Sequence, residues 1–181
     1  MNAIDFVKTA LKDYKVGAIT VSSKYVVHNV ICQLKKNCKY VIEYGAGDGT
    51  MTKELLNHLP NNGLLYAFEL NKDFIYELNK IQDKRFHLIS QDVIGGSKNL
   101  RNLNLPRIDA IVSSIPFTLF SSQNRERIIR NTYASLPPRG QFIVYQYSPL
   151  VYPLLKKYFR KVKISFEPRN FLPYFIMSVE K

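Results

Sequence analysis

The chain has 181 residues, 46% of them hydrophobic, and its 26 Lys and Arg against 14 Asp and Glu give a formal net charge of +12. This length predicts a single domain over residues 1–181, while the absence of a membrane-spanning apolar run and of a cleavable signal sequence predicts a soluble, cytoplasmic protein. The positive charge predicts affinity for anions, which are either nucleic-acid phosphates or the head groups of an acidic bilayer.

Residues 1–36 predict two leader helices. The first, over 1–14, is amphipathic, with lysines on or beside its polar side. A basic helix at a chain terminus either lies on an anionic membrane surface, here the inner face of the membrane, or packs on its own domain, and the pattern leaves both open. The second helix follows Ser22 and Ser23, either of which can cap it.

Cys32 and Cys38 have no histidine neighbours at metal-ligand spacing. We therefore expect reduced thiols and no metal site. The expected oligomeric state is a monomer or a weak dimer.

Residues 37–181 alternate short apolar runs with helical patterns, which is typical of an α/β fold with a parallel sheet. The predicted strands cover 40–44, 64–69, 86–89, 108–113 and 141–146, and the predicted helices cover 51–59, 72–81 and 123–135. Two further runs, 162–167 and 174–180, are close enough in sequence to pair as an antiparallel hairpin. The prediction is a seven-stranded, mainly parallel, Rossmann-like sheet with a C-terminal hairpin.

The end of the first predicted strand carries an acid, three alternating glycines and then a helix. Glycine allows a sharp turn and close approach by a ligand, and the helix N-terminus offers unpaired N–H groups. The residues predicted to hold a nucleotide here are Glu43, Tyr44, Gly45, Ala46, Gly47, Asp48 and Gly49.

Acids also end the next two predicted strands. Glu69, with Leu70 beside it, lies about 20 residues downstream of the glycines, where a carboxylate can accept hydrogen bonds from ribose hydroxyls. Gln91 and Asp92, followed by Val93, can face an adenine edge.

The ligand chemistry follows from Glu43. A carboxylate there would repel a pyrophosphate but attract an ammonium, which favours S-adenosylmethionine (SAM) over a dinucleotide. The E-x-G-x-G-x-G pattern with Glu69 and Asp92 resembles the class I SAM-dependent methyltransferases. That resemblance implies SAM as cofactor, S-adenosylhomocysteine as product and no metal. Ser22, Ser23 and Ser113 are also predicted to contact the cofactor.

Ser113, Ser114, Ile115, Pro116 and Phe117 end the fourth predicted strand, beside the expected methyl group. The last three resemble the N/D-[PIL]-P-[YF] motif of amino-methyltransferases such as the rRNA adenine dimethylases. Ser114 stands where those enzymes have an amide or a carboxylate, so it lacks the carbonyl or carboxylate oxygen that usually accepts a hydrogen bond from a planar amine.

A second resemblance, to the soluble bacterial phospholipid N-methyltransferases, covers nearly the whole chain. It rests on the segments 16–23, 113–116, 141–149 and 170–173, with Val21 and Ser114 as departures. It implies methylation of a lipid amine, with ethanolamine as the expected head group, by an enzyme that is cytoplasmic or peripheral on the membrane. The alternatives are an rRNA adenine N6-methyltransferase and a non-catalytic SAM- or anion-binding module.

Methyl transfer to an amine requires the amine to be neutral and aligned with the sulfonium. Tyr147 and the two serines are the predicted hydrogen-bonding partners of the amine. For the substrate, Arg169 with Asn170 is predicted to bind a head-group phosphate, and Tyr25 to line the pocket.

Overall fold

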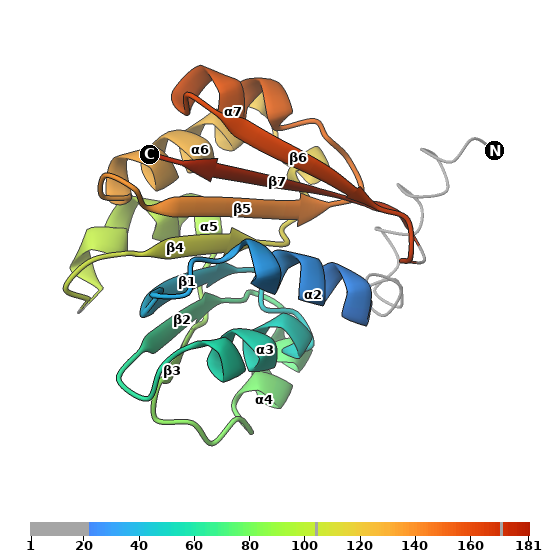
Figure 1. Cartoon of the computed structure of the whole chain (residues 1–181). Helices are drawn as coiled ribbons and strands as arrows, with labels where there is room; N and C mark the ends of the chain where they lie inside the picture. The colour runs from blue at the N-terminus through green and yellow to red at the C-terminus, as the bar shows by residue number, and fades with distance from the viewer. Residues whose placement is uncertain (1–21, 104, 171) are drawn as a thin grey trace.

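The computed structural model describes residues 22–103, 105–170 and 172–181. Within them, seven strands form one sheet that is covered by helices on both faces (Figure 1). The predicted helix over 1–14, and the membrane contact assigned to it, lie outside the described residues. No described helix is long and apolar enough to cross a membrane.

The sheet has the order β3-β2-β1-β4-β5-β7-β6. Its five parallel strands are β1 (Tyr40–Tyr44), β2 (Leu64–Phe68), β3 (Phe86–Ile89), β4 (Ala110–Ser113) and β5 (Gln141–Gln146). The antiparallel hairpin consists of β6 (Val162–Glu167) and β7 (Tyr174–Glu180). The seven-stranded sheet and its terminal hairpin confirm the predicted fold class.

Helices divide between the two faces of the sheet. One face is covered by α2 (Lys24–Gln33), α3 (Thr50–His58) and α4 (Lys72–Leu78), and the other by α5 (Val93–Gly96), α6 (Ser122–Ser135) and α7 (Tyr152–Tyr158). Short 3-10 turns, η2 (Ser97–Asn102) and η3 (Phe117–Leu119), complete the second face. The second predicted leader helix is α2, and the Ser23 side chain caps it by accepting from the Val26 N–H at 3.3 Å.

Helix α7 was not predicted. Its first turn contains Pro153, and Pro149 lies just before it. Proline is tolerated in the first turn of a helix because the N–H that it lacks has no partner there. The two prolines therefore indicated a loop in the sequence, although they are compatible with the start of a helix. The short α5 was also missed, since two of its four residues are glycines.

The pleat of the strands separates two cores. Residues on one face of β1, β4, β5 and β7 pack with α2 and α3, and residues on the other face pack with α6 and α7. Successive side chains of a strand point to opposite faces. The sheet order reverses between β1 and β4, which is where ligands bind in open α/β sheets, outside the carboxyl ends of the strands.

Candidate functional site

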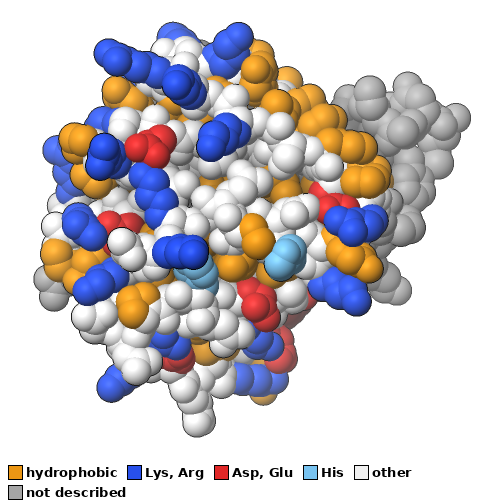
Figure 2. Space-filling model, in the orientation of Figure 1, with side chains coloured by type: hydrophobic (Ala, Val, Ile, Leu, Met, Phe, Trp, Pro, Cys, Tyr) orange, Lys and Arg blue, Asp and Glu red, His pale blue; other side chains and the backbone are white. Residues whose placement is uncertain are grey.

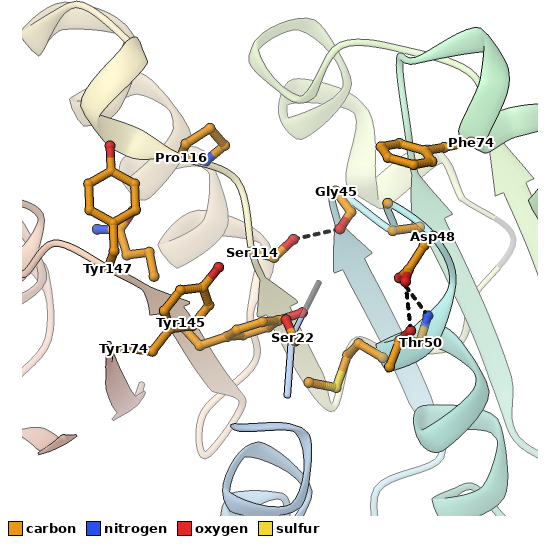
Figure 3. A pocket seen from close by; sticks show the side chains of 14 residues that line it. Ser22, Gly45, Asp48, Thr50, Phe74, Ser114, Pro116, Tyr145, Tyr147 and Tyr174 are labelled. Atoms are coloured by element: carbon orange, nitrogen blue, oxygen red, sulfur yellow. Dashed lines mark hydrogen bonds between the residues drawn. The ribbon is translucent and has the colours of Figure 1, made fainter. Parts of the chain in front are cut away.

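A cavity lies at the carboxyl ends of β1, β4 and β5, on the face covered by α2 and α3 (Figure 3). The glycine loop forms one wall and a group of tyrosines forms the other. The lining residues are Ser22, Gly45, Ala46, Gly47, Asp48, Thr50, Met51, Phe74, Ser114, Pro116, Tyr145, Gln146, Tyr147 and Tyr174. The predicted loop and the end of the fourth strand thus meet at one cavity.

The glycine loop has the backbone that its sequence requires. Gly45, Gly47 and Gly49 all have positive φ values, of 78°, 54° and 79°. A Cβ on Gly45 would lie 3.0 Å from Ile115 Cγ2, whereas a Cβ on Gly47 would meet nothing within 4 Å. Gly47 therefore leaves open the space that a ligand can fill, and Gly45 lets the loop pass close to the end of β4.

Replacing Gly45 with alanine is expected to weaken SAM binding about tenfold or more. Positive φ costs an L residue about 1–2 kcal/mol, and the added methyl must displace Ile115 or Ser114. Isothermal titration calorimetry measures the effect. The matched control is Gly95→Ala in α5, where a Cβ would meet nothing within 4 Å. Equal SAM affinity in the two variants would contradict the role given to the loop.

Glu69 holds the glycine loop in place. It follows the end of β2, and its Oε2 accepts from the Gly47 N–H at 2.8 Å. Its Oε1 accepts from the Leu70 and Asn71 N–H groups, each at 2.8 Å. The carboxylate is therefore oriented toward the loop, at the position where ribose hydroxyls can donate to it.

Glu43 is fully buried beneath the loop. Its Oε2 accepts from Thr52 Oγ1 at 2.7 Å, while its Oε1 has no hydrogen-bond partner among the described residues. Burial, with smaller contributions from the negative charges of Glu69 and Asp48, raises its pKa to about 8. A nearby cation favours ionisation of this buried carboxyl group and a nearby anion opposes it, so the site fits the ammonium of SAM better than a pyrophosphate.

The wall opposite the loop includes the hydroxyl groups of Ser114, Tyr145 and Ser22. Ser114 Oγ donates to the Gly45 carbonyl at 2.6 Å, which joins β4 to the loop. Tyr145 is almost fully buried, and its hydroxyl points toward Ser114 (Figure 3). Burial and the nearby Glu43 raise the pKa of Tyr145, while contacts with Ser114 and Ser22 oppose the increase. The three hydroxyls can together accept or donate hydrogen bonds to a polar group in the cavity.

Tyr145 was not among the predicted site residues. It lies within β5, two residues before the predicted Tyr147, and therefore points to the same face of the sheet. Counting alternate residues back from Tyr147 would have found it. Tyr147 itself lines the cavity, and its hydroxyl is hydrogen-bonded to Thr118 Oγ1.

Several predicted residues lie on the other face of the sheet. Ser113 is fully buried and its Oγ has no partner among the residues that the structure describes, and Phe117 is fully buried in the core. Tyr44 packs edge-on against Phe68 with its hydroxyl 3.2 Å from Thr132 Oγ1. Ile115 belongs to the same core. The prediction that these side chains line the site is corrected: among residues 113–117, only Ser114 and Pro116 line the cavity.

The predicted adenine contacts lie beside the cavity. Asp92 caps α5 by accepting from the Ile94 N–H at 3.0 Å, and the Val93 side chain is buried in the core. Gln91 is exposed, as is Leu70. None of these four residues lines the cavity, and their contact with adenine stays a prediction.

Arg169, Asn170 and Tyr25 form a clasp between α2 and the loop that joins β6 to β7. Arg169 pairs with Glu167 through Nε at 2.7 Å and Nη2 at 2.8 Å, and stacks on the Tyr25 ring at 4.2 Å. The Asn170 amide accepts from the Ser23 N–H at 2.7 Å and donates to the Leu172 carbonyl.

These contacts leave few free hydrogen-bond donors in the clasp to bind a phosphate. Both ends of the Asn170 amide are engaged, and Arg169 already makes a two-point pair with a carboxylate. The clasp instead holds the start of α2 against the sheet, with Ser22 in the cavity wall. Phosphate binding by these residues stays a prediction that the observed pairing does not favour.

Metal-binding groups of three or more His, Cys, Asp or Glu are absent from the described part of the chain. Both cysteines there are free thiols, with Cys32 exposed and Cys38 buried. His28 Nε2 lies 3.4 Å from Cys32 Sγ on the exposed side of α2, away from the cavity lining.

Known proteins similar to this chain include methyltransferases of two substrate classes. No protein-family profile matches it. Over 173 residues it is 25% identical to the ornithine lipid N-methyltransferase of Singulisphaera acidiphila, covering 92% of this chain and 90% of that protein. It is 32% identical over 100 residues to the ribosomal RNA small subunit methyltransferase A of Mycoplasmopsis synoviae, covering 55% of this chain and 36% of that protein.

The fold is also found in solved structures. The N-methyltransferase NodS from Bradyrhizobium japonicum, in complex with S-adenosylhomocysteine, superposes with a TM-score of 0.71 and 12% identity, covering 100% of this chain and 99% of that one. The chain therefore has the class I SAM-dependent methyltransferase fold, as the glycine loop and the strand-end acids predicted.

Proposed function

We propose that this protein is a SAM-dependent N-methyltransferase whose acceptor is the amine of a membrane-lipid head group. The observation that carries the proposal is the fully buried Glu43, whose Oε1 has no partner among the described residues, beneath a glycine loop that lines the cavity opposite a wall of hydroxyls. The similarity to an ornithine lipid N-methyltransferase along 92% of the chain supports the lipid acceptor.

Binding of the cofactor is assigned to two carboxylates. Glu43 offers negative charge to the ammonium, and Glu69 keeps the Gly47 N–H and the loop in place while it accepts from the ribose. SAM supplies an activated methyl group on its sulfonium. The protein then has to align an uncharged nitrogen with that methyl group, because the reaction is an in-line displacement.

The hydroxyl wall suits an aliphatic amine. Tyr145, Ser114 and Ser22 lie at the side of the cavity next to the end of β4, and each oxygen can accept an N–H bond. Such acceptors orient the nitrogen lone pair of a neutral primary amine toward the sulfonium. After transfer, the methylated nitrogen would lose its extra proton to solvent, and S-adenosylhomocysteine would be the second product.

A nucleobase acceptor is less well supported by the same wall. Stacking on a planar base requires an accessible aromatic ring after Pro116, and Phe117 there has 0% exposure. Ser114 also lacks the amide that grips an exocyclic amine. The similarity to an rRNA methyltransferase covers only 55% of the chain.

The acceptor class is tested with SAM tritiated on its methyl group. The purified protein is incubated separately with total RNA, with vesicles containing phosphatidylethanolamine and with vesicles containing an ornithine lipid. Label recovered in lipid supports the proposal, and the two vesicle arms identify the head group. Label recovered only in RNA would overturn it.

A further inference from the structure

Strand β6 lies at one edge of the described sheet and has an unusual surface. It is the last strand in the order, and four of its six residues, Lys163 to Phe166, are exposed. Ile164 is 45% exposed and Phe166 is 56% exposed. Soluble proteins usually protect an edge strand from contact with other molecules, so two large apolar side chains on an exposed edge indicate a binding surface.

The two apolar side chains lie side by side on one face of the strand. They are two positions apart, and Phe166 packs against Phe175 of β7 with ring centroids 5.2 Å apart. They extend the apolar surface of the hairpin outward instead of contributing to the buried core. Figure 2 shows hydrophobic side chains along the upper right rim, in the direction in which β6 runs in Figure 1.

Cations gather at the other end of the same strand. Arg160, Lys161 and Lys163 line an open groove of about 700 Å³ and are all exposed. None of these three cations makes an ion pair with a described residue. The two acids of the hairpin strands, Glu167 and Glu180, pair instead with Arg169 and Lys35. Lys and Arg side chains cluster at the upper left of Figure 2, where β6 begins in Figure 1.

We propose that the β6 edge, defined as residues 160–166, docks the protein on an anionic lipid bilayer. Its three unpaired cations match anionic head groups, each adding about fivefold to partitioning, and the two exposed apolar side chains can enter the interface. The charge of +12 on the chain favours the same partner.

Docking through this edge would bring the cavity close to the bilayer. β6 ends at Glu167, which accepts from Asn29 of α2 at 2.6 Å and pairs with Arg169 in the clasp. That clasp holds Ser22 in the cavity wall. The apolar end of β6 is therefore the end nearer to the cavity. This placement suits a lipid acceptor, so the purpose of the surface rests on the proposed function.

Vesicle flotation without SAM tests the surface independently of methyl transfer. The protein is mixed with vesicles of phosphatidylglycerol and phosphatidylcholine, or of phosphatidylcholine alone. Two variants are compared with the wild type: Arg160→Gln/Lys161→Gln/Lys163→Gln and Ile164→Thr/Phe166→Ser. The matched controls are Lys72→Gln/Lys84→Gln/Lys98→Gln and Tyr76→Ser, which change exposed residues outside the β6 edge. Thermal melting verifies that each variant is folded.

We expect the wild type and both controls to float with the anionic vesicles, and each β6 variant to bind them at least tenfold more weakly. Equal flotation of the wild type and folded β6 variants would overturn the inference, and would leave the proposed methyltransferase function standing. Equal binding to phosphatidylcholine alone would also overturn it. So would a concentration-dependent dimer, seen by light scattering, that the β6 variants abolish, since the edge would then bind a second copy of the chain.

Discussion

Replacing Glu69 with alanine is expected to weaken SAM binding about a hundredfold, because one side chain serves both the loop and the ligand. Its two oxygens accept three backbone N–H groups, including that of Gly47. Charge-assisted hydrogen bonds of this kind contribute about 1.5–3 kcal/mol each, and the ribose bonds would be lost with them. Calorimetric titration with SAM gives the change in the dissociation constant.

The control for this variant is Glu54→Ala. Glu54 is an exposed acid of α3 that lies outside the cavity lining. Its removal changes the net charge of the chain equally and should leave SAM affinity unchanged. If Glu69→Ala, still folded by thermal melting, bound SAM as tightly as Glu54→Ala, Glu69 would have no part in the site.

Replacing Glu43 with glutamine is expected to stabilise the ligand-free protein at alkaline pH. The pKa of Glu43 is raised from 4.5 to about 8 in the folded chain. Between these values the folded protein holds a proton that the unfolded chain releases, so stability falls as pH rises from about 4.5 to 8. Glutamine is neutral at every pH, so the variant should escape this loss.

The measurement is the melting temperature of both proteins from pH 5 to pH 9. At pH 5, where the Glu43 carboxyl is protonated, the two should melt within a few degrees of each other. At pH 9 the glutamine variant should melt on the order of 5 °C or more above the wild type. A constant difference between the two proteins across this range would mean that Glu43 does not titrate as its burial requires.

The same carboxyl should link SAM binding to a proton. An ammonium beside the unpaired Oε1 favours the charged form, so binding near pH 7 should release a proton from Glu43. Titrations in two buffers of different ionisation enthalpy count the protons released. The wild type should release more protons than the Glu43→Gln variant, and equal counts would place the ammonium away from Glu43.

The sheet and the glycine-loop wall of the site could be predicted from the sequence. Three glycines between a strand and a helix require an open loop, and all three have the positive φ that explains their choice. Glu69 could be predicted because a parallel strand brings the residue that follows it to the same edge as the loop. These features depend on local backbone chemistry, which is visible in a short stretch of sequence.

The opposite wall was predicted less well because it depends on the pleat of the strands. Ser113 and Ser114 are neighbours in sequence, yet Ser113 points into the core under α6 and Ser114 toward the cavity. Phe117 matched a motif but is buried, since the η3 turn after Pro116 carries its ring into that core. Tyr145 was overlooked because a residue inside a buried strand resembles a core residue.

The role of Arg169 could be predicted only in part from its neighbours in sequence. Its position in a turn suggested a free guanidinium, but the antiparallel hairpin places Glu167 beside it and α2 presents Tyr25 to its face. The Tyr25 contact depends on the packing of α2 against the hairpin, across more than a hundred residues of chain, whereas Glu167 is only two residues away in sequence. Such long-range pairing cannot be inferred from local patterns.

The central claim is that the cavity binds SAM through a carboxylate that faces its ammonium, and calorimetry of the wild-type protein tests this claim most directly. SAM, S-adenosylhomocysteine and NAD are titrated separately into the full chain at pH 9, above the pKa of about 8 that burial gives Glu43. Our account predicts saturable binding of the first two, with one site per chain, and no measurable binding of NAD, whose pyrophosphate would meet Glu43. No heat of binding with SAM, or tighter binding of NAD than of SAM, would contradict it.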